Sequence, residues 1–113
     1  MVVNAQTMIG LHFPMSVNKI RSLHGLLSKY RVRCIGSAAL TATYVATGYL
    51  TGVIDYKVKI WDIAAAYAIC SSVGIIWKFC GDAPFPLRTF HPNMRLTPYC
   101  AGSSSFMKEL ENL

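Results

Sequence analysis

The stretch WDIAAA at residues 61–66 decides how we interpret the fold, because it places one acidic side chain at the start of an almost entirely apolar helix. The apolar run continues to about Val73 and is followed by Gly74, a residue typical of helix ends. A helix that is apolar on all sides is expected to lie sandwiched between layers. An acidic residue there is costly unless it caps the helix or binds a ligand. Both roles stay open for Asp62.

Segments on either side of this helix alternate between strand-like and helix-like patterns, which predicts an α/β domain in which helices flank a layered sheet. Short runs of apolar or alternating residues indicate the strands, and apolar residues that recur every three or four positions indicate the helices. The expected elements are a strand at 8–13, a helix at 16–27, a strand at 31–35, a helix at 37–49, a strand at 53–60, a helix at 62–73, a strand at 75–79 and a helix at 103–110. Residues 81–98 hold four prolines and are expected to be mostly loop with one or two short edge strands.

Two of these segments carry more detailed predictions. In the first helix, Val17, Ile20, Leu23 and Leu27 share one face, which predicts an amphipathic surface helix. In the strand at 53–60, polar and apolar residues alternate loosely, which places Asp55, Lys57 and Lys59 on one side and the apolar residues on the other. Trp61, next to the acidic residue, is expected to belong to the core.

The composition limits the chain to one domain and suggests that part of its surface is covered by a partner. The chain has 113 residues, of which 53% are apolar and 14% are charged, whereas a soluble domain usually carries about 25% charge. Lys and Arg outnumber Asp and Glu by 11 to 5, so anionic ligands are favoured. Apolar area left exposed would promote oligomerisation.

Four scattered cysteines, Cys34, Cys70, Cys80 and Cys100, show neither a Cys-x-x-Cys pair nor zinc-finger spacing with histidine. Together with an N-terminus that lacks the pattern of a secretory signal, they predict reduced, mostly buried thiols and a cytoplasmic location.

Membrane and nucleic-acid partners are both disfavoured. The uncharged runs at 34–54 and 63–77 leave a transmembrane hairpin as an alternative, but threonines and glycines interrupt the first and the second is shorter than the roughly 20 residues a span needs. The basic residues between 19 and 33 lack the aromatic interleaving of a nucleic-acid site, so a solvated face explains them better. The three histidines, His12, His24 and His91, are expected to be surface or packing residues.

Two of the predicted strand-to-helix junctions are candidates for chemistry. Gly36, Ser37 and Ala38 begin one helix, with Ser37 as the expected N-cap, and Asp62 lies at the start of another. Free backbone N–H groups at helix starts favour anions, and ligands collect where strands end and helices begin. The two junctions are therefore expected to share one rim of the sheet.

Three motifs together resemble the C-terminal half of the inositol monophosphatase family. They are RCIGSAAL at residues 33–40, YVATG at residues 44–48 and WDIAAA at residues 61–66, and they occur in the family's order and at its separation. The family's E-A-G-G stretch is replaced here by Ser72, Val73, Gly74 and Ile75.

The resemblance implies a Mg²⁺-dependent phosphomonoesterase that hydrolyses inositol or sugar phosphates. Asp62 matches the aspartate that ligates a catalytic Mg²⁺ and contacts the phosphate. Gly36, Ser37 and Ala38 match the loop that approaches the alcohol portion of the substrate, and Asp55 matches an acidic residue, usually Glu, that accepts hydrogen bonds from substrate hydroxyls.

The family's other metal ligands belong to an N-terminal domain with a D-P-[LI]-D-[GS]-T motif, which residues 1–113 do not contain. We therefore expect a single C-terminal domain that is inactive alone, and that acts with an N-terminal half supplied in trans or as a homo-oligomer. The alternative is a truncated, non-catalytic remnant or a binding module that keeps the fold without the chemistry.

Overall fold

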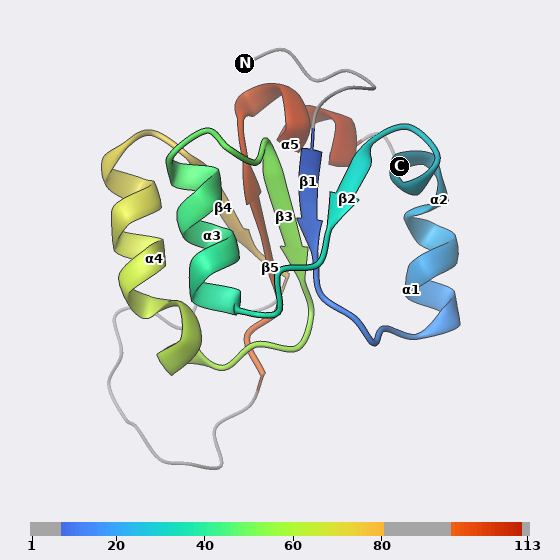
Figure 1. Cartoon of the computed structure of the whole chain (residues 1–113), viewed down its shortest axis with the longest axis horizontal. Helices are drawn as coiled ribbons and strands as arrows, with labels where there is room; N and C mark the ends of the chain where they lie inside the picture. The colour runs from blue at the N-terminus through green and yellow to red at the C-terminus, as the bar shows by residue number, and fades with distance from the viewer. Residues whose placement is uncertain (1–7, 81–95, 112–113) are drawn as a thin grey trace.

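A computed structural model describes residues 8–80 and 96–111 and shows a five-stranded sheet between two layers of helices (Figure 1). In chain order the elements are β1 (Met8–Leu11), α1 (Val17–Ser22), α2 (His24–Leu27), β2 (Arg31–Arg33), α3 (Ala38–Ala46), β3 (Gly52–Asp55), α4 (Ile60–Ser72), β4 (Ile76–Phe79), β5 (Tyr99–Gly102) and α5 (Ser104–Glu111). The prediction of a layered α/β domain is confirmed.

The sheet has the strand order β2-β1-β3-β5-β4 and is mixed. Strands β2, β1 and β3 run parallel, and β5 runs antiparallel to both of its neighbours, β3 and β4. The carboxyl ends of the three parallel strands therefore lie at one edge of the sheet. The helices that follow β2 and β3 begin at this edge (Figure 1).

Each face of the sheet has its own hydrophobic core. On one face, β1 and β3 pack against α2 and α5 through a cluster that includes Ile9, Leu11, Leu26, Ile54 and Phe106. On the other face, β3 and β5 pack against α3 and α4 through Val45, Val53, Ile63, Tyr99 and Ala101. Burial on both faces explains why these strands read as continuous apolar runs.

Two glycines on neighbouring strands make room for the largest side chain of α5. Gly52 on β3 and Gly102 on β5 are register partners, and a Cβ atom at either position would overlap the Phe106 ring. Ser103 precedes this helix, and its hydroxyl accepts a hydrogen bond from the Phe106 N–H at 3.3 Å, as the predicted serine cap requires. The ring therefore fixes α5 against the middle of the sheet.

The sequence did not reveal β5, although it pairs on both sides. Its residues, Tyr99 to Gly102, include a glycine and directly follow Pro98, and both residue types are depleted in strands. The glycine is present because the Phe106 ring covers it. Most of the predicted loop, residues 81–95, lies outside the described residues.

The first predicted helix is confirmed, and its predicted face is buried only in part: Leu23 belongs to the core and Leu27 packs against it. Ser16 caps it by accepting a hydrogen bond from the Lys19 N–H at 3.2 Å. The helix is interrupted at Leu23 and continues as α2. Val17 is 62% exposed, whereas Leu26, outside the predicted stripe, is buried. The predicted single helix is therefore two short helices, of which the part from Leu23 onward supplies the buried residues.

The strand expected at 53–60 is wrong in length and in pattern. Strand β3 ends at Asp55, and all four of its residues are buried. Val58 and Ile60 are buried beyond the strand end, where the chain crosses toward α4. Helices cover β3 on both faces, so the side chains on both sides of the strand are buried and the alternation of polar and apolar residues does not distinguish them.

Helix α4 covers one face of the sheet and is not sandwiched between layers. Ile60, Ile63, Ala66 and Cys70 form its buried stripe, at the spacing of a single helical face. The small alanines elsewhere on the helix face solvent, and Trp61 is 46% exposed rather than buried in the core. The prediction from composition was wrong because alanine is tolerated on exposed helix faces as well as in cores.

The basic residues of the first helical region and β2 are exposed, as predicted for a solvated face. All four cysteines are free, but only Cys70 is buried, so the prediction of mostly buried thiols was wrong. Within residues 8–80 and 96–111, no helix is long and apolar enough to cross a membrane.

A surface cluster joins α2 to the C-terminal helix and gives the fold a pH dependence. The Lys29 ammonium donates to Glu109 Oε1 at 2.8 Å, and the Tyr30 hydroxyl donates to Glu109 Oε2. These bonds, that of Lys29 first, hold the pKa of Glu109 below its usual value. A carboxyl group whose pKa is depressed on folding stabilises the protein above the pKa of the unfolded chain, and this stabilisation is lost as the pH falls through the folded-state pKa.

Glu109→Gln is therefore expected to lose less stability than the wild type on acidification, by a small margin because the pair is exposed. The check is urea unfolding at about pH 7 and about pH 3. Glu111→Gln, a change to an exposed carboxylate on the same helix, is the control. Identical acid sensitivity in Glu109→Gln and the wild type would contradict this origin of the pH dependence.

Candidate functional site

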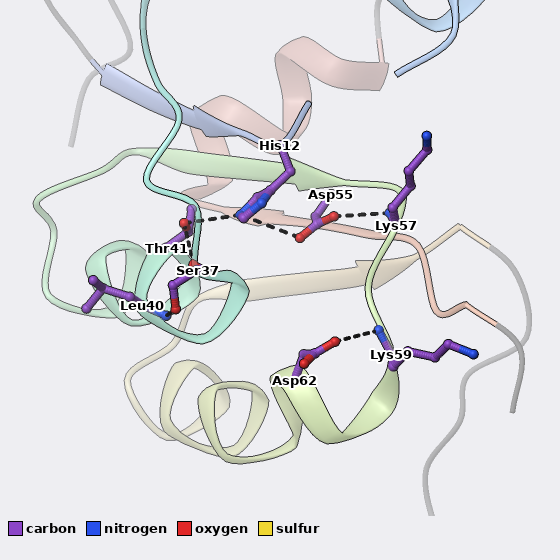
Figure 2. Close-up of polar contacts among 8 residues, drawn as sticks. All are labelled: His12, Ser37, Leu40, Thr41, Asp55, Lys57, Lys59 and Asp62. Atoms are coloured by element: carbon purple, nitrogen blue, oxygen red, sulfur yellow. Dashed lines mark hydrogen bonds and ion pairs between the residues drawn. The ribbon is translucent and has the colours of Figure 1, made fainter. Parts of the chain in front are cut away.

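The candidate site lies at the edge of the sheet where the parallel strands end. His12 directly follows β1 and Asp55 is the last residue of β3, and the register that pairs Leu11 with Ile54 brings them side by side. His12 Nε2 lies 3.6 Å from Asp55 Oδ2 and 3.3 Å from Thr41 Oγ1 (Figure 2). The imidazole therefore bridges β3 and α3.

Asp55 is held firmly within this group. Its side chain is 2% exposed, and its Oδ1 accepts a hydrogen bond from the Lys57 N–H at 3.1 Å. Tyr99 is its register partner on β5, and burial, with the negative charge of Asp55 as a second cause, raises the pKa of Tyr99 above its ordinary value. Buried carboxylates need such partners, because an unpaired buried charge is strongly unfavourable.

The Tyr99 side chain adds an unpaired polar atom beside this group. Its ring stacks on Trp77, with centroids 4.1 Å apart and planes within 9° of parallel. Within the described residues its hydroxyl is buried and has no hydrogen-bond partner. A buried hydroxyl in that state costs about 1–3 kcal/mol.

The loop before α3 supplies a second group of polar atoms. The Ser37 hydroxyl accepts a hydrogen bond from the Leu40 N–H at 3.2 Å, so the predicted N-cap is confirmed. The Thr41 hydroxyl donates to the Ser37 carbonyl at 2.8 Å and also contacts His12 (Figure 2). Gly36 has a φ of +83°, a conformation that favours glycine, and turns the chain from β2 into the helix. Helix α3 ends at Ala46, three residues before the predicted end.

Asp62 lies in the first turn of α4, close to the position predicted for it. Its Oδ2 accepts a hydrogen bond from the Lys59 N–H at 3.0 Å, so it does cap this helix (Figure 2). The side chain is exposed. An ionised carboxylate has about four lone-pair sites, so one capping bond leaves it able to bind a cation as well. The two roles left open by the sequence are compatible.

The structure brings some of the predicted site residues together and keeps another apart. Ser37 and Asp55 belong to one network, which passes through Thr41 and His12 (Figure 2). Asp62 lies at the start of the neighbouring helix, where it accepts the Lys59 N–H, and this contact lies apart from the network (Figure 2). The rim is shared, as predicted, in that both helices begin at the same edge of the sheet.

His12 is the residue that the sequence prediction missed. It was expected to be a surface or packing residue, but its ring makes both polar contacts that join β1 to the site. The available signal was its position near the end of the strand predicted at 8–13, which in the structure ends at Leu11 and leaves His12 directly after it. His24 is exposed, as expected, and His91 lies outside the described residues.

A magnesium ion would find part of its ligand set here. The Asp62 carboxylate is a hard oxygen donor and is open to solvent, which suits Mg²⁺. Across residues 8–80 and 96–111, however, no group of three or more His, Cys, Asp or Glu side chains is placed to hold a metal ion. The residues present fit one ligand of a magnesium site, and not the whole site.

The buried carboxylate gives a prediction about stability. Asp55→Ala is expected to lower the free energy of unfolding by about 1–3 kcal/mol, because it leaves the Lys57 N–H without its acceptor and removes the carboxylate that lies 3.6 Å from His12. Asp55→Asn keeps an acceptor oxygen and should cost less. Urea unfolding of both variants measures the difference. Equal losses would mean that the negative charge, which both variants remove, matters at this position and that the acceptor oxygen does not.

Known proteins resemble this chain in sequence. A sequence model of the inositol monophosphatase family matches residues 10–96. A protein of Thermotoga maritima described as fructose-1,6-bisphosphatase/inositol-1-monophosphatase is 41% identical over 52 residues, which cover 45% of this chain and 20% of that protein. An uncharacterized protein of Sinorhizobium fredii, y4fL, is 36% identical over 45 residues, covering 40% of this chain and 16% of its own length.

Solved structures agree in fold. The suppressor protein SuhB of Bartonella henselae superposes with a TM-score of 0.74 at 22% identity, covering 96% of this chain and 41% of that one. SuhB of Mycobacterium tuberculosis gives a TM-score of 0.71 at 22% identity, covering 96% and 40%. The chain thus spans about two fifths of the solved structures that it resembles. Because the family model covers most of the chain, this protein belongs to the inositol monophosphatase family.

Proposed function

We propose that this chain is the C-terminal domain of a Mg²⁺-dependent phosphomonoesterase that acts on inositol or sugar phosphates. One observation carries the proposal: α3 and α4 both begin at the edge where the parallel strands end, with Ser37 at the start of one and Asp62 in the first turn of the other. Backbone N–H groups at two helix starts favour an anion there, and the exposed Asp62 carboxylate favours its counter-cation.

Each residue has a distinct part in the proposed site. Gly36, Ser37 and Ala38 would approach the alcohol portion of the substrate mainly through backbone atoms. The Ser37 hydroxyl already caps α3, and the other two residues have little or no side chain. Asp55 would meet substrate hydroxyls only at the edge of its carboxylate, because it is buried. His12, with 19% of its side chain exposed, would reach them more readily and is oriented by Asp55.

Asp62 would hold Mg²⁺ through the lone pairs that its capping bond leaves free. When bound, the metal ions of such a site activate water and stabilise the leaving oxygen during hydrolysis of the phosphate ester. Asp62 alone cannot provide near-octahedral coordination, so the remaining ligands must come from outside the described residues. An N-terminal half, a longer chain or a second copy would each supply them.

Known structures support the substrate class. One solved inositol monophosphatase, SaIMPase-II, has inositol monophosphate bound, and it superposes with a TM-score of 0.72 at 20% identity over 44% of its length. Its ligand indicates which phosphate esters to test first. The free cysteines are in keeping with the cytoplasmic location expected from the sequence, which remains part of the proposal.

The proposal is tested by Mg²⁺-dependent phosphate release from inositol monophosphate and fructose 1,6-bisphosphate. The chain is assayed alone and after co-expression with the N-terminal half of the Thermotoga maritima relative, whose association is checked by co-purification. Activity is expected only with that half and Mg²⁺ present. A single chain joining that half to Met1 keeps the test valid if the separate polypeptides do not associate. An associated but inactive complex would count against the proposal.

A second function class has one observation in its favour. The lack of a three-ligand metal group within the described residues suits a binding module that keeps the fold without hydrolysis. Such a module would bind inositol monophosphate in calorimetry with the same affinity with and without Mg²⁺. The phosphatase domain would require the ion.

A further inference from the structure

A pocket lies on the face of the sheet opposite the candidate site. It has a volume of about 480 Å³, and its walls come from the α1–α2 region, β3, β5, the end of β4 and α5. Ile54 and Cys100 line it, and both belong to the core on the α2 and α5 side, whereas Asp55 points to the other face. Polar groups around it include Arg21, His24 and Cys80. The proposed phosphatase chemistry uses none of these residues.

Two of the lining residues, Cys80 and Cys100, are cysteines. Cys100 pairs with Lys78 across the β4–β5 ladder, and the Cys80 N–H donates to the Pro98 carbonyl at 2.9 Å. Residues two apart on one strand share a face, so Cys80 and Cys100 are diagonal neighbours on the same side of the ladder. Both side chains line the pocket, and both thiols are free.

The surroundings distinguish the two thiols. The neighbouring Cys100 thiol lowers the pKa of Cys80 to about 7, and the positive charges of Lys19 and Lys78 act in the same direction against burial. The neighbouring Cys80 thiol, together with burial, raises the pKa of Cys100. Since the thiolate is the reactive form, Cys80 is the nucleophile of the pair near neutral pH and Cys100 keeps its proton.

We propose that Cys80 and Cys100 form a thiol–disulfide exchange site that reacts with an anionic low-molecular-weight disulfide such as glutathione disulfide. The observations that point to this class are the placement of both thiols on one side of the β4–β5 ladder, their shared pocket and the basic side chains of Lys19, Arg21 and Lys78 around it, which complement the carboxylates of glutathione. The proposal does not depend on the phosphatase function.

The exchange proceeds in two steps. The Cys80 thiolate attacks one sulfur of glutathione disulfide, a mixed disulfide forms, and one glutathione leaves as a thiolate that takes a proton from water. Cys100 then loses its proton, and its sulfur attacks Cys80 Sγ, so that the Cys80–Cys100 bond forms as the second glutathione leaves. The two cysteines lose two electrons in total, and the small disulfide is reduced to two thiols.

The test uses the full chain with Cys34→Ser, which removes the other exposed thiol. After incubation with glutathione disulfide, free thiols are alkylated and the peptides are mapped by mass spectrometry. A Cys80–Cys100 linked peptide that dithiothreitol reverses is expected. Adding Cys100→Ser should leave glutathione attached to Cys80. Adding Cys80→Ser instead should leave Cys100 to react with glutathione disulfide about tenfold or more slowly than Cys80 does, because the low-pKa thiol is gone.

Two results would overturn the proposal. One is a wild-type chain in which Cys34 acquires glutathione while Cys80 and Cys100 remain reduced. The other is stable glutathione on Cys80 even when Cys100 is present, which would show that the second thiol does not resolve the first. The wild-type result stands even if a serine variant folds poorly, and circular dichroism reports whether it does.

Discussion

Phe106→Ala is expected to lower the free energy of unfolding by about 3–5 kcal/mol, the range for removing a fully buried aromatic side chain. The Phe106 ring is 0% exposed and lies over Gly52 and Gly102, which have no side chains with which to fill the space that the ring would leave. Because the strands beneath it are paired in the middle of the sheet, the cavity cannot close by a small backbone shift.

Phe13→Ala is the matched control, since Phe13 is 48% exposed and should lose far less stability. Urea unfolding followed by circular dichroism gives both values. A loss at Phe106 no larger than at Phe13 would mean that α5 does not pack on the sheet as described. Gly102→Ala approaches the same contact from the other side and should also destabilise the protein, because the new methyl group would overlap the ring.

Asp62→Asn is expected to reduce phosphate release by about 100-fold or more in the complex with the N-terminal half. Changing a residue that merely supports a metal ligand costs about 10–100-fold, and loss of a direct ligand should exceed this. The asparagine side chain keeps an oxygen that can accept the Lys59 N–H, so the cap of α4 is preserved while the charge is removed.

Glu109→Gln is the control for this variant, because it removes one negative charge from a carboxylate that pairs with Lys29 and Tyr30 rather than with the site. Its activity should match the wild type. If Asp62→Asn were as active as Glu109→Gln, Asp62 would be only a helix cap.

Much of the fold could be predicted from the sequence because local signals and tertiary structure agree. Ser16 and Ser37 cap the helices that their positions indicated. Helix α4 begins beside Asp62 and ends just before Gly74, which has a φ of +81°. Caps and glycine turns depend on the nearest few residues, so they can be read without knowledge of the rest of the chain.

The errors arose where distant contacts decide the structure. Strand β5 was missed because Gly102 suits a strand only with the Phe106 ring above it. The exposure of Val17 and the burial of Leu26 were missed because the first helical region is two short helices with a break at Leu23 and not one continuous helix. Neither the packing of α5 nor that break is encoded within one segment.

The site was predicted in part for the same reason. Ser37 and Asp62 are marked by helix starts, so their positions were accessible from the sequence. The role of His12 depends on the parallel register of β1 and β3, which brings it to Asp55. Asp55 itself is buried at the end of β3, although the sequence placed it on the same side as Lys57 and Lys59.

The central claim is that the edge formed by the starts of α3 and α4 binds the metal and the phosphate. It is tested most directly by NMR of the isotope-labelled chain in complex with the N-terminal half, with paramagnetic Mn²⁺ replacing Mg²⁺ and inositol monophosphate present. The account predicts selective broadening of the amide signals of Ser37, Ala38, Asp62 and Ile63, and loss of that broadening in Asp62→Asn. Broadening centred on Glu109 and Glu111 instead, or unchanged broadening in Asp62→Asn, would contradict it.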